Sequence, residues 1–170
     1  MNTPGLTITE NFNHKSQEIR NYLTNAKPSI VVAHLKASHW RYEYELIPRI
    51  EQNFVGLIKL FPQLPSLPVI FNLFIKFQLA MKIHITIEEK KIYKAYLANS
   101  RRANENNVSH EDEEPFLNEI IALLKKERCL SNPFCRTLIL QLERFEAELI
   151  EHTWIEENIV NKKIQKKHSL

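Results

Sequence analysis

Apolar residues recur every three or four positions over most of the chain, which is the pattern of amphipathic α-helices rather than of β-strands. The pattern predicts four helices, over residues 29–61, 69–98, about 109–127 and 133–160. Their core-facing stripes are expected to be Val32, Leu35, His39, Tyr42, Leu46, Ile50 and Phe54; Ile70, Phe74, Phe77, Met81, His84, Glu88 and Ile92; His110, Glu114, Leu117, Ile121 and Leu124; and Leu138, Leu142, Phe145, Leu149, His152, Glu156 and Val160. Polar or proline-rich connections join them, so we predict an all-α fold, an antiparallel up-down-up-down four-helix bundle.

Prolines mark several features of the predicted helices. Pro48 lies inside the first long helix and should bend it. Pro115 lies early in the third helix, which therefore kinks there or begins a turn later than the periodicity suggests. Pro133 belongs to a helix-start signal and begins the fourth helix. The chain is accordingly divided into an arm or short helix over residues 1–28, the bundle over 29–161 and a basic tail over 162–170.

The composition restricts the classes of function. With 170 residues the chain is long enough for one domain with its own core. It has 2 glycines, too few for a Gly-rich phosphate loop, and 2 cysteines, too few for a disulfide framework or a thiolate zinc site. Its net charge of +3 does not require a nucleic-acid or membrane partner, and we expect neither. The most apolar stretch, residues 64–87, carries prolines and polar residues and is not expected to span a membrane. We see no export signal and therefore expect a cytoplasmic protein.

Histidine and glutamate interrupt the apolar stripes at equivalent places. One histidine lies on the core-facing stripe of each predicted helix, at His39, His84, His110 and His152. A glutamate follows each of them four residues later, at Glu43, Glu88, Glu114 and Glu156. Residues four apart share a helix face, and a buried charge needs a partner or a metal. Converging nitrogen and oxygen donors of this kind favour iron or manganese over a structural zinc site.

The alternative is a helical bundle whose histidines are hydrogen-bonded core residues. A single histidine on an apolar stripe is more often of this kind, and His14 with Glu18 has the same spacing, which we attribute to chance. Four such histidines, one on each predicted helix, favour the metal site. The order of the residues also excludes one class, because ferritin-like carboxylate bundles use Glu-x-x-His and this motif does not occur in the sequence.

Four stretches resemble the hemerythrin-like bundle of the iron–sulfur cluster repair di-iron proteins, the RIC family, over residues 27–161. They are HLKASHWRYEYELIPRI with His39, HITIEEKKIY with His84 and Glu88, SHEDEEPFL with His110, and EHTWIEENIV with His152 and Glu156. The resemblance implies four histidines and two bridging carboxylates around two iron ions. The implied ligands are His39, His84, Glu88, His110, His152 and Glu156, with Glu43 and Glu114 outside the ligand set and Glu89 and Glu157 pointing away.

The same resemblance implies a role in the repair of iron–sulfur clusters damaged by nitric oxide or oxidants. The partners it implies are a small molecule such as nitric oxide or O2, and iron–sulfur proteins. The alternative is a hemerythrin-like module that binds or senses O2 or nitric oxide without turnover, so whether the protein is an enzyme stays open. The chain departs from the family in two places. Residues 1–28 hold no cysteine where the family usually has an N-terminal cysteine-containing domain, and Tyr93-Lys94 and Asn161-Lys162 replace the Phe-Pro pairs after the glutamate motifs.

Overall fold

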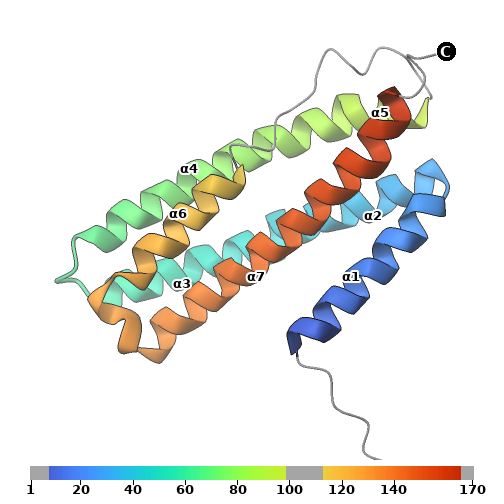
Figure 1. The fold of residues 1–170 in the computed structure, drawn as a ribbon. Helices are drawn as coiled ribbons and strands as arrows, with labels where there is room; N and C mark the ends of the chain where they lie inside the picture. Colours follow the sequence, from blue (N-terminus) through green and yellow to red (C-terminus); the bar gives the residue numbers. More distant parts are fainter. Residues whose placement is uncertain (1–7, 99–112, 166–170) are drawn as a thin grey trace, which may run out of the picture.

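The fold is all-helical, as predicted, throughout the part of the chain that the computed structural model describes, residues 8–98 and 113–165 (Figure 1). The α-helices are α1 (Ile8–Asn25), α2 (Pro28–Arg41), α3 (Ile47–Leu60), α4 (Ser66–Ile87), α5 (Tyr93–Leu97), α6 (Glu113–Lys125), α7 (Pro133–Ile155) and α8 (Lys162–Gln165). A 3₁₀ turn, η4 (Arg128–Ser131), precedes α7. The apolar residues of the predicted stripes that lie in this part of the chain are all buried or partly buried.

The helix boundaries follow from local chemistry. Pro28 is the first residue of α2, where the missing amide hydrogen costs nothing. The side chain of Asn132 accepts a hydrogen bond of 2.8 Å from the backbone N–H of Phe134 and so caps α7. Pro115 is the third residue of α6 as described, and the predicted helix start near Ser109 lies outside the described residues.

Three π-helical segments interrupt the long helices of the described chain, and the periodicity did not predict them. They are η1 (Tyr42–Leu46), η2 (Glu88–Ile92) and η5 (Glu156–Asn161). The predicted single helix over 29–61 is therefore α2, η1 and α3 in succession, with Pro48 in the first turn of α3. Such segments are rare and often occur at functional sites.

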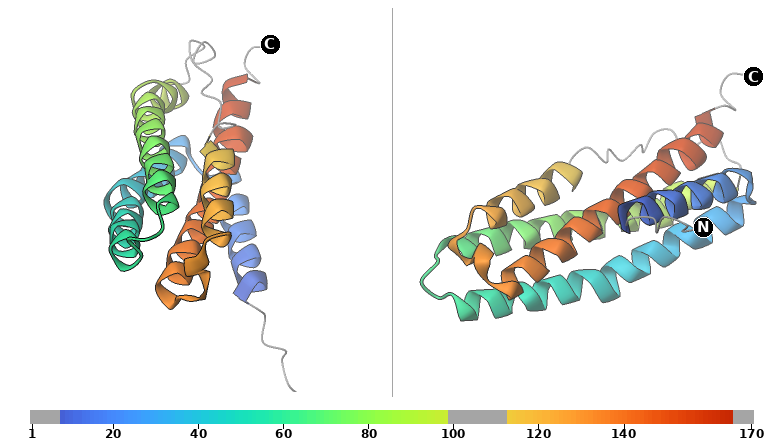
Figure 2. Two further views of the ribbon diagram at one scale, coloured as in Figure 1. Left: turned by 90° about the vertical axis from the view of Figure 1, so that its left-hand side faces the viewer. Right: turned by 60° about the horizontal axis from the view of Figure 1, so that its bottom comes forward.

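The helices pack side by side around a shared interior (Figures 1 and 2). Helix α3 contacts α4 and α7, and α6 contacts the same two helices. Helix α2 contacts α5, and α1 lies against α7. The α1–α7 contact includes a bidentate ion pair in which Arg20 Nη2 lies 2.7 Å from Glu151 Oε2.

The interior consists of two apolar clusters with polar residues between them. The larger cluster is built mainly from α3, α4, α6 and α7 and contains Tyr42, Ile85 and Leu149. The smaller cluster joins α1, α2, α5, α7 and η5 and contains Leu35, Tyr93 and Ile155. His39, Glu88 and His152 are buried polar side chains. Each of them lies, along the sequence, between a residue of the larger cluster and a residue of the smaller cluster, and together they form the buried polar layer.

The continuous helix from Ser66 to Leu97 is long and apolar enough, by length and composition alone, to cross a membrane. A core helix meets the same criterion. This helix supplies Phe74 and Phe77 to the larger cluster and Glu88 to the buried polar layer. The absence of a membrane partner therefore stays a prediction.

Candidate metal centre

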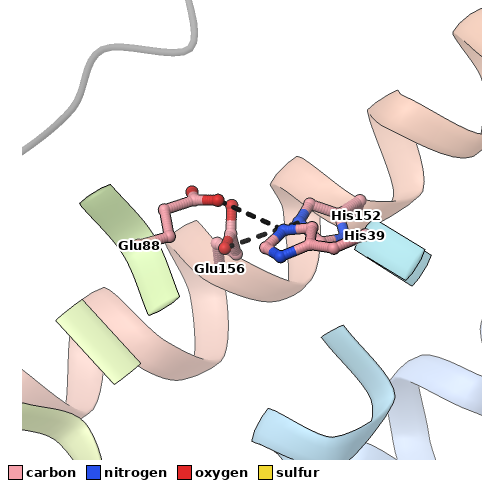
Figure 3. Close-up of side chains that lie close together, drawn as sticks. All are labelled: His39, Glu88, His152 and Glu156. Atoms are coloured by element: carbon pink, nitrogen blue, oxygen red, sulfur yellow. Dashed lines mark hydrogen bonds and ion pairs between the residues drawn. The ribbon is translucent and has the colours of Figure 1, made fainter. Parts of the chain in front are cut away.

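Four of the six predicted ligands meet in the interior. They are His39 from α2, Glu88 at the start of η2, His152 from α7 and Glu156 at the start of η5 (Figure 3). One donor atom from each of them lies within 4.8 Å of the others. All four side chains are at most 6% exposed, so they form a closed group of two imidazoles and two carboxylates.

The donor atoms point toward one another. The Nε2 atoms of His39 and His152 are 3.1 Å apart. His39 Nε2 also lies 3.2 Å from Glu88 Oε2, and His152 Nε2 lies 3.5 Å from Glu156 Oε1. The group therefore presents two nitrogen and two oxygen donors to a common point, which is the arrangement a metal ion needs.

Of the two remaining predicted ligands, His84 lies beside this group. Its Nε2 is 2.7 Å from Glu88 Oε1, the second oxygen of that carboxylate, and its side chain is buried. The spacing of four between His84 and Glu88 places both on one face of the same helix, as the sequence predicted. His110 lies outside the described residues, as does the side chain of Glu114.

A small void lies against three of the four side chains, and Glu156 is not part of its lining. It has a volume of about 10 Å³, and its lining includes His39, His84, Glu88 and His152. A single water molecule needs roughly 10–15 Å³ measured in this way. The void is thus of atomic size, and apolar side chains such as Met81, Ile85 and Leu149 complete its lining.

The electrostatics of the group also favour a cation. Burial, together with the nearby charge of Glu156, raises the pKa of Glu88 to about 9, although the hydrogen bond with His39 acts in the opposite direction. Two buried carboxylates close together cannot both ionise cheaply unless a positive charge lies between them. A bound metal ion would supply that charge and displace the proton.

The prediction that Glu89 points away from the centre is wrong. Its Oε1 lies 3.1 Å from Nδ1 of His39, and its Oε2 lies 3.0 Å from Nζ of Lys36. A metal-binding histidine commonly donates its other ring N–H to a carboxylate, which fixes the tautomer and leaves the first nitrogen free for the metal. Glu157, the equivalent neighbour of Glu156, is exposed.

Tyr93 is a residue of the centre that the sequence reasoning missed. Its hydroxyl donates a hydrogen bond of 2.5 Å to Glu156 Oε1 and lies 3.3 Å from His39 Nε2. Its ring stacks on that of His39, with 5.6 Å between the ring centroids and 13° between the planes. Burial and the negative charges of Glu156 and Glu88 raise the pKa of Tyr93 well above its ordinary value, so the phenol keeps its proton at neutral pH.

A larger cavity is also lined by His152. It has a volume of about 410 Å³ and is bounded by α1, α2 and α7. Tyr42 and His152 line both this cavity and the small void, so they separate the two spaces. The Tyr42 ring meets His152 edge-on, and its hydroxyl donates to the backbone oxygen of Glu148. His34, which was not predicted as a ligand, also lines the cavity, and burial lowers its pKa.

No protein-family model, curated protein or solved structure matches this chain. The structure itself supports an all-helical protein with a buried histidine–glutamate group that could hold a metal. The conclusions about function that follow are drawn from the geometry of this group and from the sequence motifs.

Proposed function

We propose that the protein is a non-haem di-iron protein. The observation that carries the proposal is the buried group of His39, Glu88, His152 and Glu156, whose donor atoms lie within 4.8 Å of one another. Mixed imidazole and carboxylate donors suit iron, and the group contains no thiolate that would favour a structural zinc ion. His84 and His110 complete the proposed ligand set, in which Glu88 and Glu156 would supply the carboxylates that balance the charge of the iron.

We propose with it that the helices follow the up-down-up-down order of a hemerythrin-like bundle. The packing supports this order, because α3 contacts α4, α4 contacts α6, α6 contacts α7, and α7 contacts α3. Contacts between successive helices that close a ring are typical of a four-helix bundle, whose metal sites are built from side chains on facing helices.

The proposed biological role is the repair of iron–sulfur clusters damaged by nitric oxide or oxidants, in the cytoplasm. It rests on the motifs around His39, His84, His110 and His152, which resemble those of the RIC family. Iron held there would supply the redox and ligand-exchange chemistry. The protein side chains hold the ions, exclude water and keep the carboxylates in place, and an iron–sulfur protein would be the partner.

The second candidate function is binding or sensing of O2 or nitric oxide without turnover. The cavity of about 410 Å³ favours it, because His152 belongs both to the lining of this space and to the buried group. Pockets of roughly 300–1,000 Å³ accept small ligands. A diatomic gas would therefore have room close to the centre, separated from it by Tyr42 and His152.

Metal analysis tests the di-iron proposal directly. Protein expressed in iron-rich medium should contain about two iron ions per chain by mass spectrometry. Glu88→Ala and Glu156→Ala should each strongly reduce the iron content, because each removes a charged donor. Glu43→Ala is the matched control, since Glu43 also follows a histidine by four residues but lies outside the group. A folded wild-type protein without iron would leave the structural bundle with core histidines as the better explanation.

A second experiment separates the two candidate functions. The iron-loaded protein is mixed with an iron–sulfur enzyme that has lost its cluster iron, and the recovery of that enzyme is measured. Recovery that depends on Glu88 and Glu156 supports the repair role. Reversible binding of O2 or nitric oxide with no recovery and no consumption of the gas supports the binding module.

A further inference from the structure

We propose that Tyr93 is a positioning residue of the metal centre, whose hydroxyl holds the carboxylate of Glu156 in its ligating orientation. This inference rests on the proposed metal-binding function and adds a residue outside the six ligands. Tyr93 would act on the metal through Glu156 and would not itself be a ligand.

The contacts of Tyr93 support this role. The hydroxyl lies 2.5 Å from Glu156 Oε1 and 3.3 Å from His39 Nε2, so it touches both a carboxylate and an imidazole of the group. The ring stacks on His39 and is 1% exposed, so it cannot rotate away without disturbing the smaller apolar cluster. A phenol fixed in this way restrains one carboxylate oxygen and leaves the second oxygen for other contacts.

The backbone explains how Tyr93 reaches this position. Tyr93 follows Glu88 by five residues, and in a regular α-helix it would lie about 140° round the axis from Glu88. The backbone N–H of Tyr93 instead bonds to the carbonyl of Glu88, which widens this turn into the π segment η2. Glu88 and Tyr93 are therefore both buried on the inner side of the helix, while Lys90 and Lys91 between them are exposed.

Among the described residues, the hydroxyl of Tyr93 makes its hydrogen bonds inside the metal group, with Glu156 and His39. A hydroxyl required only for folding would be expected to bond to backbone or to a side chain outside the centre. Groups that orient metal ligands typically contribute roughly ten- to a hundred-fold to metal affinity.

The test is Tyr93→Phe, which removes the hydroxyl and keeps the ring. Tyr96→Phe is the matched control, because Tyr96 is buried in the same short helix and its hydroxyl has no hydrogen-bond partner among the described residues. Iron affinity is measured by competition with a chelator, and the absorption spectrum of the Co²⁺-loaded protein reports the ligand geometry. We expect Tyr93→Phe to weaken iron binding by about ten- to a hundred-fold and to change the spectrum, and Tyr96→Phe to do neither.

A measurement on the metal-free protein separates this inference from the proposed function. The proton of a short hydrogen bond is strongly deshielded, and burial slows its exchange with water, so it should give an observable far-downfield resonance in NMR. The resonance should disappear in Tyr93→Phe and in Glu156→Ala and persist in Tyr96→Phe. If wild-type protein shows the resonance but binds no metal, the proposed function fails and the positioning role fails with it. If wild type binds metal and Tyr93→Phe binds it equally well, only the role of Tyr93 is overturned.

Discussion

At the scale of single residues, the candidate metal centre includes side chains that contact the proposed ligands as well as the proposed ligands themselves. The carboxylate of Glu89 contacts both Lys36 Nζ and His39 Nδ1. The other ring nitrogen of His39, Nε2, faces the other proposed ligands. Burial acts to raise the pKa of Glu89, but the hydrogen bonds from Lys36 and His39 outweigh it and hold that pKa below its ordinary value. The carboxylate is therefore ionised at neutral pH and favours a proton on Nδ1 of His39.

We accordingly predict that Glu89→Ala weakens iron binding by roughly ten-fold, because His39 loses the group that fixes its tautomer and orientation. The measurement is the same competition with a chelator. Glu157→Ala is the control, since Glu157 stands next to Glu156 as Glu89 stands next to Glu88 but is exposed to solvent. Equal affinities for the two variants would show that the contact between Glu89 and His39 has no effect on the metal.

At the scale of helices, the periodicity of apolar residues predicted most of the fold. The stripe that includes Phe74, Phe77 and Met81 is buried as expected, because a single helical face must cover the core. The same face predicted that Glu88 and Glu156 would point inward. The π segments could not be predicted in this way. The inserted residue in η2 shifts the buried face by one position, and apolar residues stand at both Ile92 and Tyr93, so the shift is hidden in the sequence.

The π segment η2 also explains why Tyr93 was missed. Counting at 100° per residue puts Tyr93 off the face that bears Glu88, yet the wider turn returns it to that face. Glu89 was missed for a different reason. Its α-carbon lies one position round the helix from Glu88, but α2 packs on that side and brings Lys36 and His39 within reach of its long side chain. Only the tertiary structure supplies that contact.

The extra residue in η2 should make the protein tolerate a deletion there that it would not tolerate in a regular α-helix. Removing Lys90 should convert η2 into an ordinary α-helical turn, in which Glu88 and Tyr93 are four apart and still share a face. The protein should remain folded, with cooperative thermal unfolding by circular dichroism. Removing Lys76, which is also exposed but lies in regular α4, should rotate one part of the helix by about 100° relative to the other.

The deletion of Lys76 would move buried residues such as Phe74 or Phe77 off the core face. Large losses of this kind cost about 3–5 kcal/mol for each phenylalanine, which exceeds what a domain of this size can tolerate at several positions. We therefore expect this variant to lose its cooperative transition. The explanation of η2 as a one-residue insertion would be wrong if the two deletions were equally damaging.

At the scale of the whole molecule, the polar layer between the two apolar clusters is a cost of folding that a metal would offset. The clusters bury many large side chains, each worth about 1.5–3 kcal/mol, so the helices should stay folded without metal. The layer itself brings Glu88 and Glu156 together away from water. A ligand that binds only the native state adds stability that grows with the logarithm of its concentration relative to its dissociation constant, so metal should raise the melting temperature.

The final prediction concerns the pH dependence of the metal-free protein. The pKa of Glu88 is raised to about 9 from an ordinary value of 4.5, so between these values the folded protein holds a proton that the unfolded chain has released. The contribution of Glu88 to stability is therefore most favourable below pH 4.5 and is lost as the pH rises through 9. Glu88→Gln cannot titrate, and it should be more stable than the wild type near pH 8 without metal.

The measurement is the free energy of unfolding of both proteins in chelator at several pH values between 5 and 9. The difference between them reports the titration of Glu88 together with the neighbouring groups that are coupled to it, such as Glu156 and His39. We expect Glu88→Gln to gain on the wild type steadily as the pH rises, and to lose most of the stabilisation that iron gives to the wild type. Glu88 would then lower the stability of the metal-free protein and raise the stability of the metal-bound protein, as expected of a metal ligand. A difference that stayed constant with pH would show that Glu88 is ionised in the folded protein, and that its charge is already balanced by neighbouring side chains.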